Sequence, residues 1–228
     1  MSENGEQQRL QEIATLRQHG LITAQEAYER HLAVVGAAPS ASAPEQTAEG
    51  SFSRATLLLW AVIVAAIGGL LAIPAAFLQE LTNGGFFVVF VGAPIIEEAL
   101  KPAGVYILLI RWPHALLGRF HTAFLSAVAG LCFALVESLL YVELYFPEGS
   151  SDYVLFRFTV PVALHVIASF VVGLGLSRSL IDWAAGRAPL SKSTRNFYIA
   201  GASIHAVYNT TAVVLSLIGV LDFERDLP

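Results

Sequence analysis

Long apolar segments alternate with short polar connections along most of the chain, from Arg54 onward. Segments of this kind are long enough to cross a bilayer as helices, because about 20 residues span its hydrocarbon core. Four prolines fall inside the segments and are expected to kink or break the helices locally. The pattern predicts an all-α fold, a polytopic membrane helical bundle of about five transmembrane helices, at residues 54–78, 84–110, 120–146, 153–183 and 197–221.

The first 53 residues have a different, polar pattern. Leucine and isoleucine recur at helical spacing between residues 7 and 19, and Gly20 is expected to end that helix. Thr23 and Glu26 have the spacing of a capping box that begins a second helix. We therefore expect a soluble helical hairpin at 1–35, a flexible linker at 36–53, the membrane domain at 54–221 and a short tail at 222–228.

Composition supports a multi-pass protein of the cell membrane. Hydrophobic residues make up 55% of the 228 residues and charged residues only 14%, whereas a soluble domain carries about a quarter charged residues. The single cysteine excludes an internal disulfide and a CxxC metal site. Clustered basic residues that would indicate nucleic acid are lacking.

The charges of the loops predict the orientation in the membrane. The connections at 111–119 and 178–195 are basic, whereas the loops that contain Glu80 and Glu148 are acidic. Because basic loops favour the cytoplasmic side, we expect the N-terminus in the cytoplasm. Arg157, near the outer end of the fourth span, departs from this pattern and is a candidate site residue.

A polar motif interrupts the second apolar segment, where Glu97, Glu98 and Lys101 occur together. Ionisable side chains at membrane depth are costly and mark functional sites. Lys101 follows the two glutamates by four and three residues, so a helix places it over both, and an ion pair offsets part of the burial cost. The surplus negative charge favours a proton, a bound cation or general-base chemistry.

Three further segments carry polar groups at a similar depth. Glu137 lies in the third segment, and His165 and His205 lie in the fourth and fifth. Each histidine is followed four residues later by a small polar residue on the same helix face, Ser169 or Asn209. At a rise of about 1.5 Å per residue, these groups fall within a few turns of the middle of the membrane. We expect them to converge on one water-accessible chamber.

Each group alone also has a structural interpretation. The motif around Lys101 is compatible with a structural ion pair, Glu137 with a protonated acid bonded to a carbonyl, and His165 with a packing residue. Together these interpretations require several separate costly burials. Two other classes stay open: a proton- or cation-coupled carrier, which predicts inverted repeats that the sequence does not show, and a non-catalytic immunity or scaffold protein.

Four motifs occur in the order and spacing of the PrsW family of intramembrane proteases: Glu97-Glu98-x-x-Lys101, Phe133-x-x-x-Glu137, His165-x-x-x-Ser169 and His205-x-x-x-Asn209. This family is related to the CAAX prenyl endopeptidases and bacteriocin-processing membrane proteins. The chain departs from it at Ser138, where the family often has Asn, and at Ser169, where it often has Thr. The N-terminal hairpin resembles the short two-helix SHOCT domains, which are thought to mediate oligomerisation.

The resemblance implies an endopeptidase that hydrolyses a peptide bond of a membrane-associated protein with an activated water. In PrsW the substrate is an anti-sigma factor, so the expected partners are a membrane-protein substrate of that kind, the lipid bilayer and, through the hairpin, a second copy of the chain. The expected catalytic residues are Glu97, Glu98, Glu137, His165 and His205, with Lys101, Ser169, Asn209 and Arg157 in support.

Related proteins are often classed as metalloproteases, which makes zinc the expected cofactor. His165, His205 and a glutamate, Glu137 in the first instance, are the candidate ligands of a catalytic zinc site with an open position. The chain has no HExxH motif, so the spacing does not demand a metal, and a metal-free mechanism with a glutamate base stays open.

Overall fold

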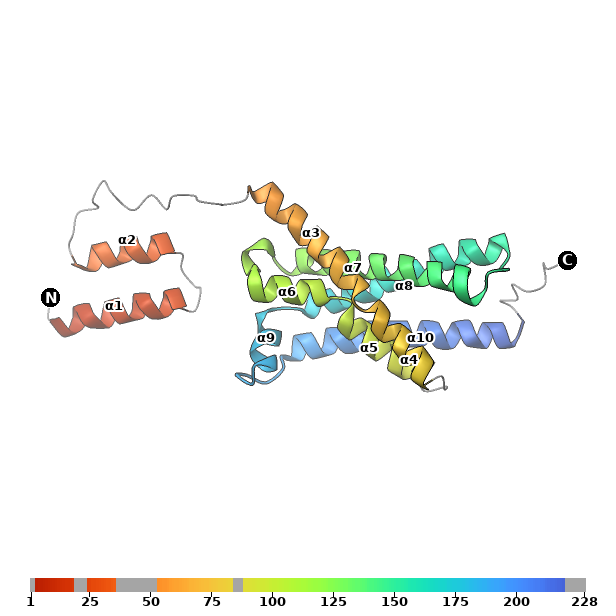
Figure 1. Ribbon diagram of the computed structural model, residues 1–228. Helices are drawn as coiled ribbons and strands as arrows, with labels where there is room; N and C mark the ends of the chain where they lie inside the picture. The colour runs from red at the N-terminus through yellow and green to blue at the C-terminus, as the bar shows by residue number, and fades with distance from the viewer. Residues whose placement is uncertain (1–2, 19–23, 36–52, 84–87, 220–228) are drawn as a thin grey trace. The chain divides into compact units, whose positions relative to one another are not determined.

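The computed structural model describes residues 3–18, 24–35, 53–83 and 88–219, and the chain divides into two compact units, residues 1–51 and 52–228. In the first unit, helices α1 (Glu3–Gln18) and α2 (Ala24–Val35) lie side by side (Figure 1). This agrees with the expected hairpin. The expected helix stop at Gly20 and the capping residue Thr23 lie outside the described residues.

The second unit is built from helices, and the described residues contain no strand. This confirms the prediction of an all-helical fold. Its elements are α3 (Arg54–Leu70), α4 (Ile73–Asn83), the π turn η1 (Val88–Gly92), α5 (Ala93–Leu100), α6 (Ala103–Arg111), the 3₁₀ turn η2 (Pro113–Ala115), α7 (Arg119–Leu140), the π turn η3 (Tyr141–Tyr145), α8 (Ser151–Gly175), α9 (Arg178–Ala184) and α10 (Lys192–Leu217).

Three helical segments of the described chain are long and apolar enough to cross a membrane: Arg54–Leu78, Arg119–Tyr145 and Ser151–Gly175. They correspond to the first, third and fourth expected spans. The expected end of the fourth span at residue 183 is wrong, because α8 ends at Gly175 and α9 begins as a separate helix at Arg178.

The other two expected spans, 84–110 and 197–221, are not among these three segments. Residues 84–110 do not form one helix, because Pro102 lacks the N–H that would continue α5, and α6 begins after it. Helix α10 is long enough, but its histidine, asparagine and threonine residues make it less apolar than the three candidate spans. Both departures coincide with segments that carry the polar motifs.

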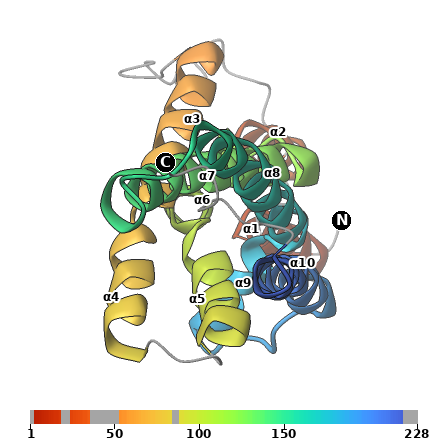
Figure 2. The same ribbon diagram turned by 90° about the vertical axis from the view of Figure 1, so that its right-hand side faces the viewer.

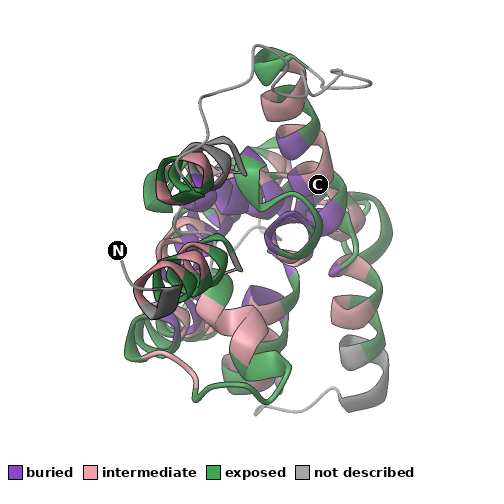
Figure 3. Cartoon of the chain, turned by 90° about the vertical axis from the view of Figure 1, so that its left-hand side faces the viewer, coloured by how far each residue is buried: buried purple, intermediate pink, exposed green. Residues whose placement is uncertain are grey.

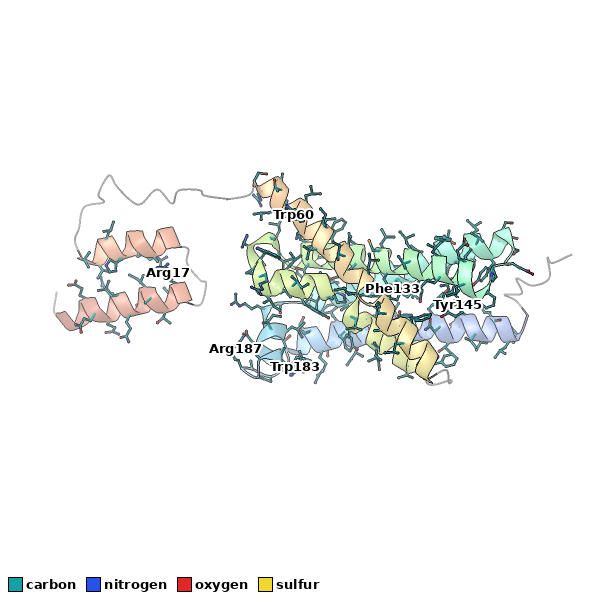
Figure 4. The ribbon with its side chains drawn as sticks, viewed as in Figure 1. Arg17, Trp60, Phe133, Tyr145, Trp183 and Arg187 are labelled. Carbon is teal, nitrogen blue, oxygen red and sulfur yellow. The ribbon has the colours of Figure 1, made fainter. Side chains whose placement is uncertain are left out.

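Successive segments of this unit run back and forth along its length. Helices α7, α8 and α10 lie roughly parallel or antiparallel, and α3 crosses them obliquely (Figures 1 and 2). Trp183 and Arg187 lie at the end where α10 begins, Tyr145 lies at the opposite end, and Phe133 lies between them (Figure 4). The basic connections therefore share one end, and the acidic 146–150 connection lies at the other.

Glycines permit close contacts between the helices, as is common in membrane bundles. A Cβ atom on Gly104 of α6 would overlap the carbonyl oxygen of Val64 on α3. A Cβ atom on Gly130 of α7 would lie 2.6 Å from the carbonyl oxygen of His165 on α8. The most buried residues lie where the helices face one another, and the outer surface of the unit is exposed (Figure 3).

Candidate active site

Helix α5 presents Glu97 and Glu98 to the interior, and the turn that follows it presents Lys101. These side chains are almost completely buried, with residue exposures of 5%, 0% and 0%. The Lys101 Nζ atom lies 2.6 Å from Glu98 Oε1 and 3.1 Å from Glu97 Oε2. The ammonium therefore compensates charge on both carboxylates, which lowers the cost of burying them.

Helix α8 places His165 against the same lysine. The Nδ1 atom of His165 lies 2.7 Å from Lys101 Nζ, and its Nε2 atom lies 3.0 Å from Glu137 Oε2 on α7. Because an ammonium group only donates, Nδ1 accepts and the proton of the neutral ring lies on Nε2, which donates to Glu137. Lys101 and Glu137 therefore fix the tautomer of His165 together, and they orient its ring.

Helix α10, which packs against α8, brings His205 next to His165 and to the carboxylates of α5. The Nδ1 atom of His205 lies 3.1 Å from Glu98 Oε1, and its Nε2 atom lies 3.9 Å from Glu97 Oε2. The His205 ring stands edge-on to His165, with ring centroids 4.7 Å apart. The hydroxyl of Ser169 donates to Glu98 Oε2 at 3.3 Å, so Glu98 is held by partners from α8 and α10 as well as by Lys101.

Arg157 extends the cluster toward the 146–150 end. Its Nη2 atom lies 3.5 Å from Glu137 Oε2, and its guanidinium stacks over the ring of Tyr141 at 3.9 Å. The Ser138 hydroxyl donates to the Arg157 carbonyl oxygen at 2.7 Å and so joins α7 to α8. The serine that departs from the family pattern thus has a structural role beside the site.

Part of this cluster lines a cavity of about 240 Å³. It continues past Phe146, Tyr153 and Val213, toward the end of the unit that holds the 146–150 connection. The polar and charged side chains in its wall include Glu97, Glu137, Arg157, His165, His205 and Asn209. Glu98, Lys101 and Ser169 do not line it, so they act on the cavity through the residues that they contact.

Among the described residues, two buried side-chain atoms lack a hydrogen-bond partner, and both belong to the site: Arg157 Nε and Glu97 Oε2. The Oε2 atom of Glu97 has no such partner although the Lys101 ammonium lies 3.1 Å away, without hydrogen-bond alignment. An unpaired buried carboxylate oxygen is costly unless water or a cation meets it. This oxygen belongs to a residue that lines the cavity, which is where a water or a metal ion would lie.

Glu97 also belongs to a group of three side chains that could hold a metal ion. Glu97, His165 and His205 each offer a ligand atom, and these atoms lie within 4.8 Å of one another. A carboxylate with two imidazoles is the donor set of many catalytic zinc sites, and Glu98 at His205 Nδ1 is the kind of outer partner that orients such ligands. The residues therefore fit a metal ion, although the donor set does not fix which one.

The group differs in one member from the sequence expectation. Glu137 was the expected carboxylate ligand, but the structure brings Glu97 to the two histidines and directs Glu137 to His165 Nε2. The reason is that α8 and α10 lie side by side and α5 packs against this pair, which sequence spacing does not reveal. Both ring nitrogens of His165 have partners, Lys101 at Nδ1 and Glu137 at Nε2. His165 must therefore give up one of these two contacts to bind a metal.

Comparison with known protein families agrees with this arrangement. Residues 53–223 match the family described as PrsW family intramembrane metalloprotease, which is most of the chain. The protein belongs to this family. It is therefore a peptidase of the intramembrane type. Neither the curated proteins nor the solved structures contain a match to the chain. The N-terminal hairpin lies outside the matched residues, and its SHOCT resemblance stays a prediction.

The sequence did not reveal two tyrosines that hold the backbone of α5, the helix that carries Glu97 and Glu98 in this PrsW family member. The Tyr198 hydroxyl, on α10, donates to the carbonyl oxygen of Ile95 at 2.7 Å. The Tyr106 hydroxyl, on α6, donates to the carbonyl oxygen of Ala99 at 2.8 Å. Tyr198 lies seven residues before His205 and so faces the same way, which is the signal that could have identified it.

Proposed function

We propose that this protein hydrolyses a peptide bond of a single-span membrane protein, of the anti-sigma-factor kind, with a water activated at Glu97. The observation that carries the proposal is the buried Oε2 atom of Glu97, which has no hydrogen-bond partner and lies beside His165 and His205 at a cavity. A carboxylate in this setting is ready to accept a proton from a water, because Lys101 gives it charge compensation without a hydrogen bond.

In the proposed reaction, Glu97 takes a proton from the attacking water and later delivers it to the leaving amine. Asn209, in the cavity wall, donates through its side-chain amide to the oxygen on which negative charge develops. Glu98 holds His205 through Nδ1, and Glu137 holds His165 through Nε2. Lys101 holds the two carboxylates in position through its contacts with both.

A metal ion held by Glu97, His165 and His205 would supply Lewis acidity, which makes water a stronger nucleophile and polarises the peptide carbonyl. Glu97 would then act as a ligand, and only the residues around the three ligands would keep the roles given above. Glu98, Glu137 and Lys101 orient the ligands and balance their charge.

We further propose five membrane crossings with the N-terminus in the cytoplasm. The alternating directions of α3–α4, α5–α6, α7, α8 and α10 support five crossings (Figure 1). The basic connections at one end of the unit support the orientation. The cavity then extends toward the outer face, where the substrate would enter, and the cytoplasmic hairpin would serve self-association.

The test is co-expression with a panel of tagged single-span membrane proteins, followed by immunoblotting for fragments. We expect wild type and Glu148→Gln to produce the same fragments, because Glu148 is exposed and does not line the cavity. Glu97→Gln keeps the size of the side chain and removes the base, so it should produce none. Fragments of equal yield from Glu97→Gln would refute the proposal.

A further inference from the structure

A second, apolar pocket lies at the opposite end of the unit from the mouth of the active-site cavity. It has a volume of about 540 Å³ and lies between α6, the end of α8, α9 and α10. Its wall includes Leu176, Leu180 and Trp183. If the chain crosses the membrane five times, as proposed above, this pocket opens at the cytoplasmic end of the spans, where lipid acyl chains reach it. Hydrocarbon chains are therefore the available occupants.

The rim of this pocket has a basic character. Arg195 lines it and is exposed. The nearby Arg187 is paired with Asp182, Nη2 to Oδ1, at 2.7 Å, whereas Arg195 has no acidic partner in the part of the chain that the structure describes. Trp183, a residue type that favours the membrane interface, lines the same pocket. A cation at interface level beside an apolar pocket complements the phosphate of a lipid headgroup.

We infer that this pocket is a binding site for an anionic phospholipid. One acyl chain lies among the apolar side chains of α6, α8 and α9, and the phosphate pairs with Arg195. The pocket wall also includes Tyr106 and Tyr198, the two tyrosines that hold the backbone of α5. The bound chain therefore packs against the support of the segment that carries Glu97.

Another apolar pocket provides an internal comparison. It has a volume of about 260 Å³, lies between α3 and α6, and is lined by Trp60 and Trp112 among other apolar residues. No charged side chain lines it within the described chain. It should therefore accept acyl chains without a preference for the headgroup.

The experiment uses tryptophan fluorescence in vesicles, because acyl chains that carry bromine quench tryptophan only on contact. A Trp60→Phe/Trp112→Phe variant retains Trp183 alone, and a Trp183→Phe variant retains the other two. Each is titrated with brominated phosphatidylglycerol or brominated phosphatidylcholine. We expect Trp183 to favour phosphatidylglycerol roughly fivefold, the ratio for about 1 kcal/mol per basic residue near a membrane surface, and the other pair to show no such preference.

Two substitutions in the Trp183-only background decide the role of Arg195. Arg195→Gln should bring the ratio close to one, whereas Arg187→Gln, which removes an arginine already paired with Asp182, should preserve it. Equal quenching by the two lipids, or a preference that survives Arg195→Gln, would overturn the inference. The lipid measurement does not depend on proteolysis, so Glu97→Gln should retain the preference for phosphatidylglycerol. This inference and the proposed function can therefore fail separately.

Discussion

Lys101 is the residue whose removal tests the organisation of the site most directly. It is completely buried, and its ammonium contacts Glu98, Glu97 and His165 at 2.6, 3.1 and 2.7 Å. Lys101→Met keeps a side chain of similar length and removes the charge. The two carboxylates then lie in the protein interior without their main compensating partner.

Breaking a buried ion pair by removing one partner costs about 3–5 kcal/mol, because the other charge stays buried and unpaired. Replacing both partners by neutral groups of similar shape costs much less. Lys101→Met should therefore lower the free energy of unfolding by about 3–5 kcal/mol, and adding Glu98→Gln should restore about 1–3 kcal/mol of it. The fall in thermal midpoint for the single variant should be roughly 10 °C.

The assay is unfolding of the purified protein in detergent, with the single variants and the double variant measured side by side. Lys192→Met is the matched control, because Lys192 is exposed at the start of α10, and its midpoint should match wild type. The reasoning is refuted if Lys101→Met costs less than about 1 kcal/mol, or if the double variant loses the sum of the two single losses.

Three other outcomes are expected. Gly104→Ala should cost about 1–3 kcal/mol in the same unfolding assay, because its Cβ overlaps the Val64 carbonyl oxygen; an unchanged midpoint would contradict this packing. Tyr198→Phe removes the hydroxyl that holds the Ile95 carbonyl, so the cleavage rate should fall severalfold while the fold, read by circular dichroism, is retained; an unchanged rate would remove its positioning role. Strong chelation should abolish cleavage by the purified enzyme and added zinc should restore it, whereas activity that persists under chelation would favour the metal-free glutamate mechanism.

The sequence predicted the helical class, the bounds of two long spans to within one residue and most of a third span, because apolar length is a local property of the chain. It also identified the motif residues, since an ionisable group in an apolar segment is conspicuous without any knowledge of packing. The structure brings Glu97, His165 and His205 together, as expected for one chamber.

Several properties that depend on packing between helices could not be predicted from the sequence. The nearness of Glu97 to both histidines depends on how α5 packs against the neighbouring helices α8 and α10, which no spacing along one segment records. The break at Pro102 was anticipated, but the tyrosine hydroxyls on the backbone of α5 were not, because tyrosine in an apolar helix has many ordinary roles. The sequence singled out Arg157 by its position but could not show its stacking on Tyr141.

The close contact of α7 with α8 has a consequence for how a substrate is admitted. Gly130 packs directly against the backbone at His165, and Gly173 against Ala123, so these two helices form a rigid frame that carries one half of the site. The rest is carried by α10, which supplies His205, and by α5, a short helix bounded by the proline break. A substrate is therefore expected to reach the site without separation of α7 from α8.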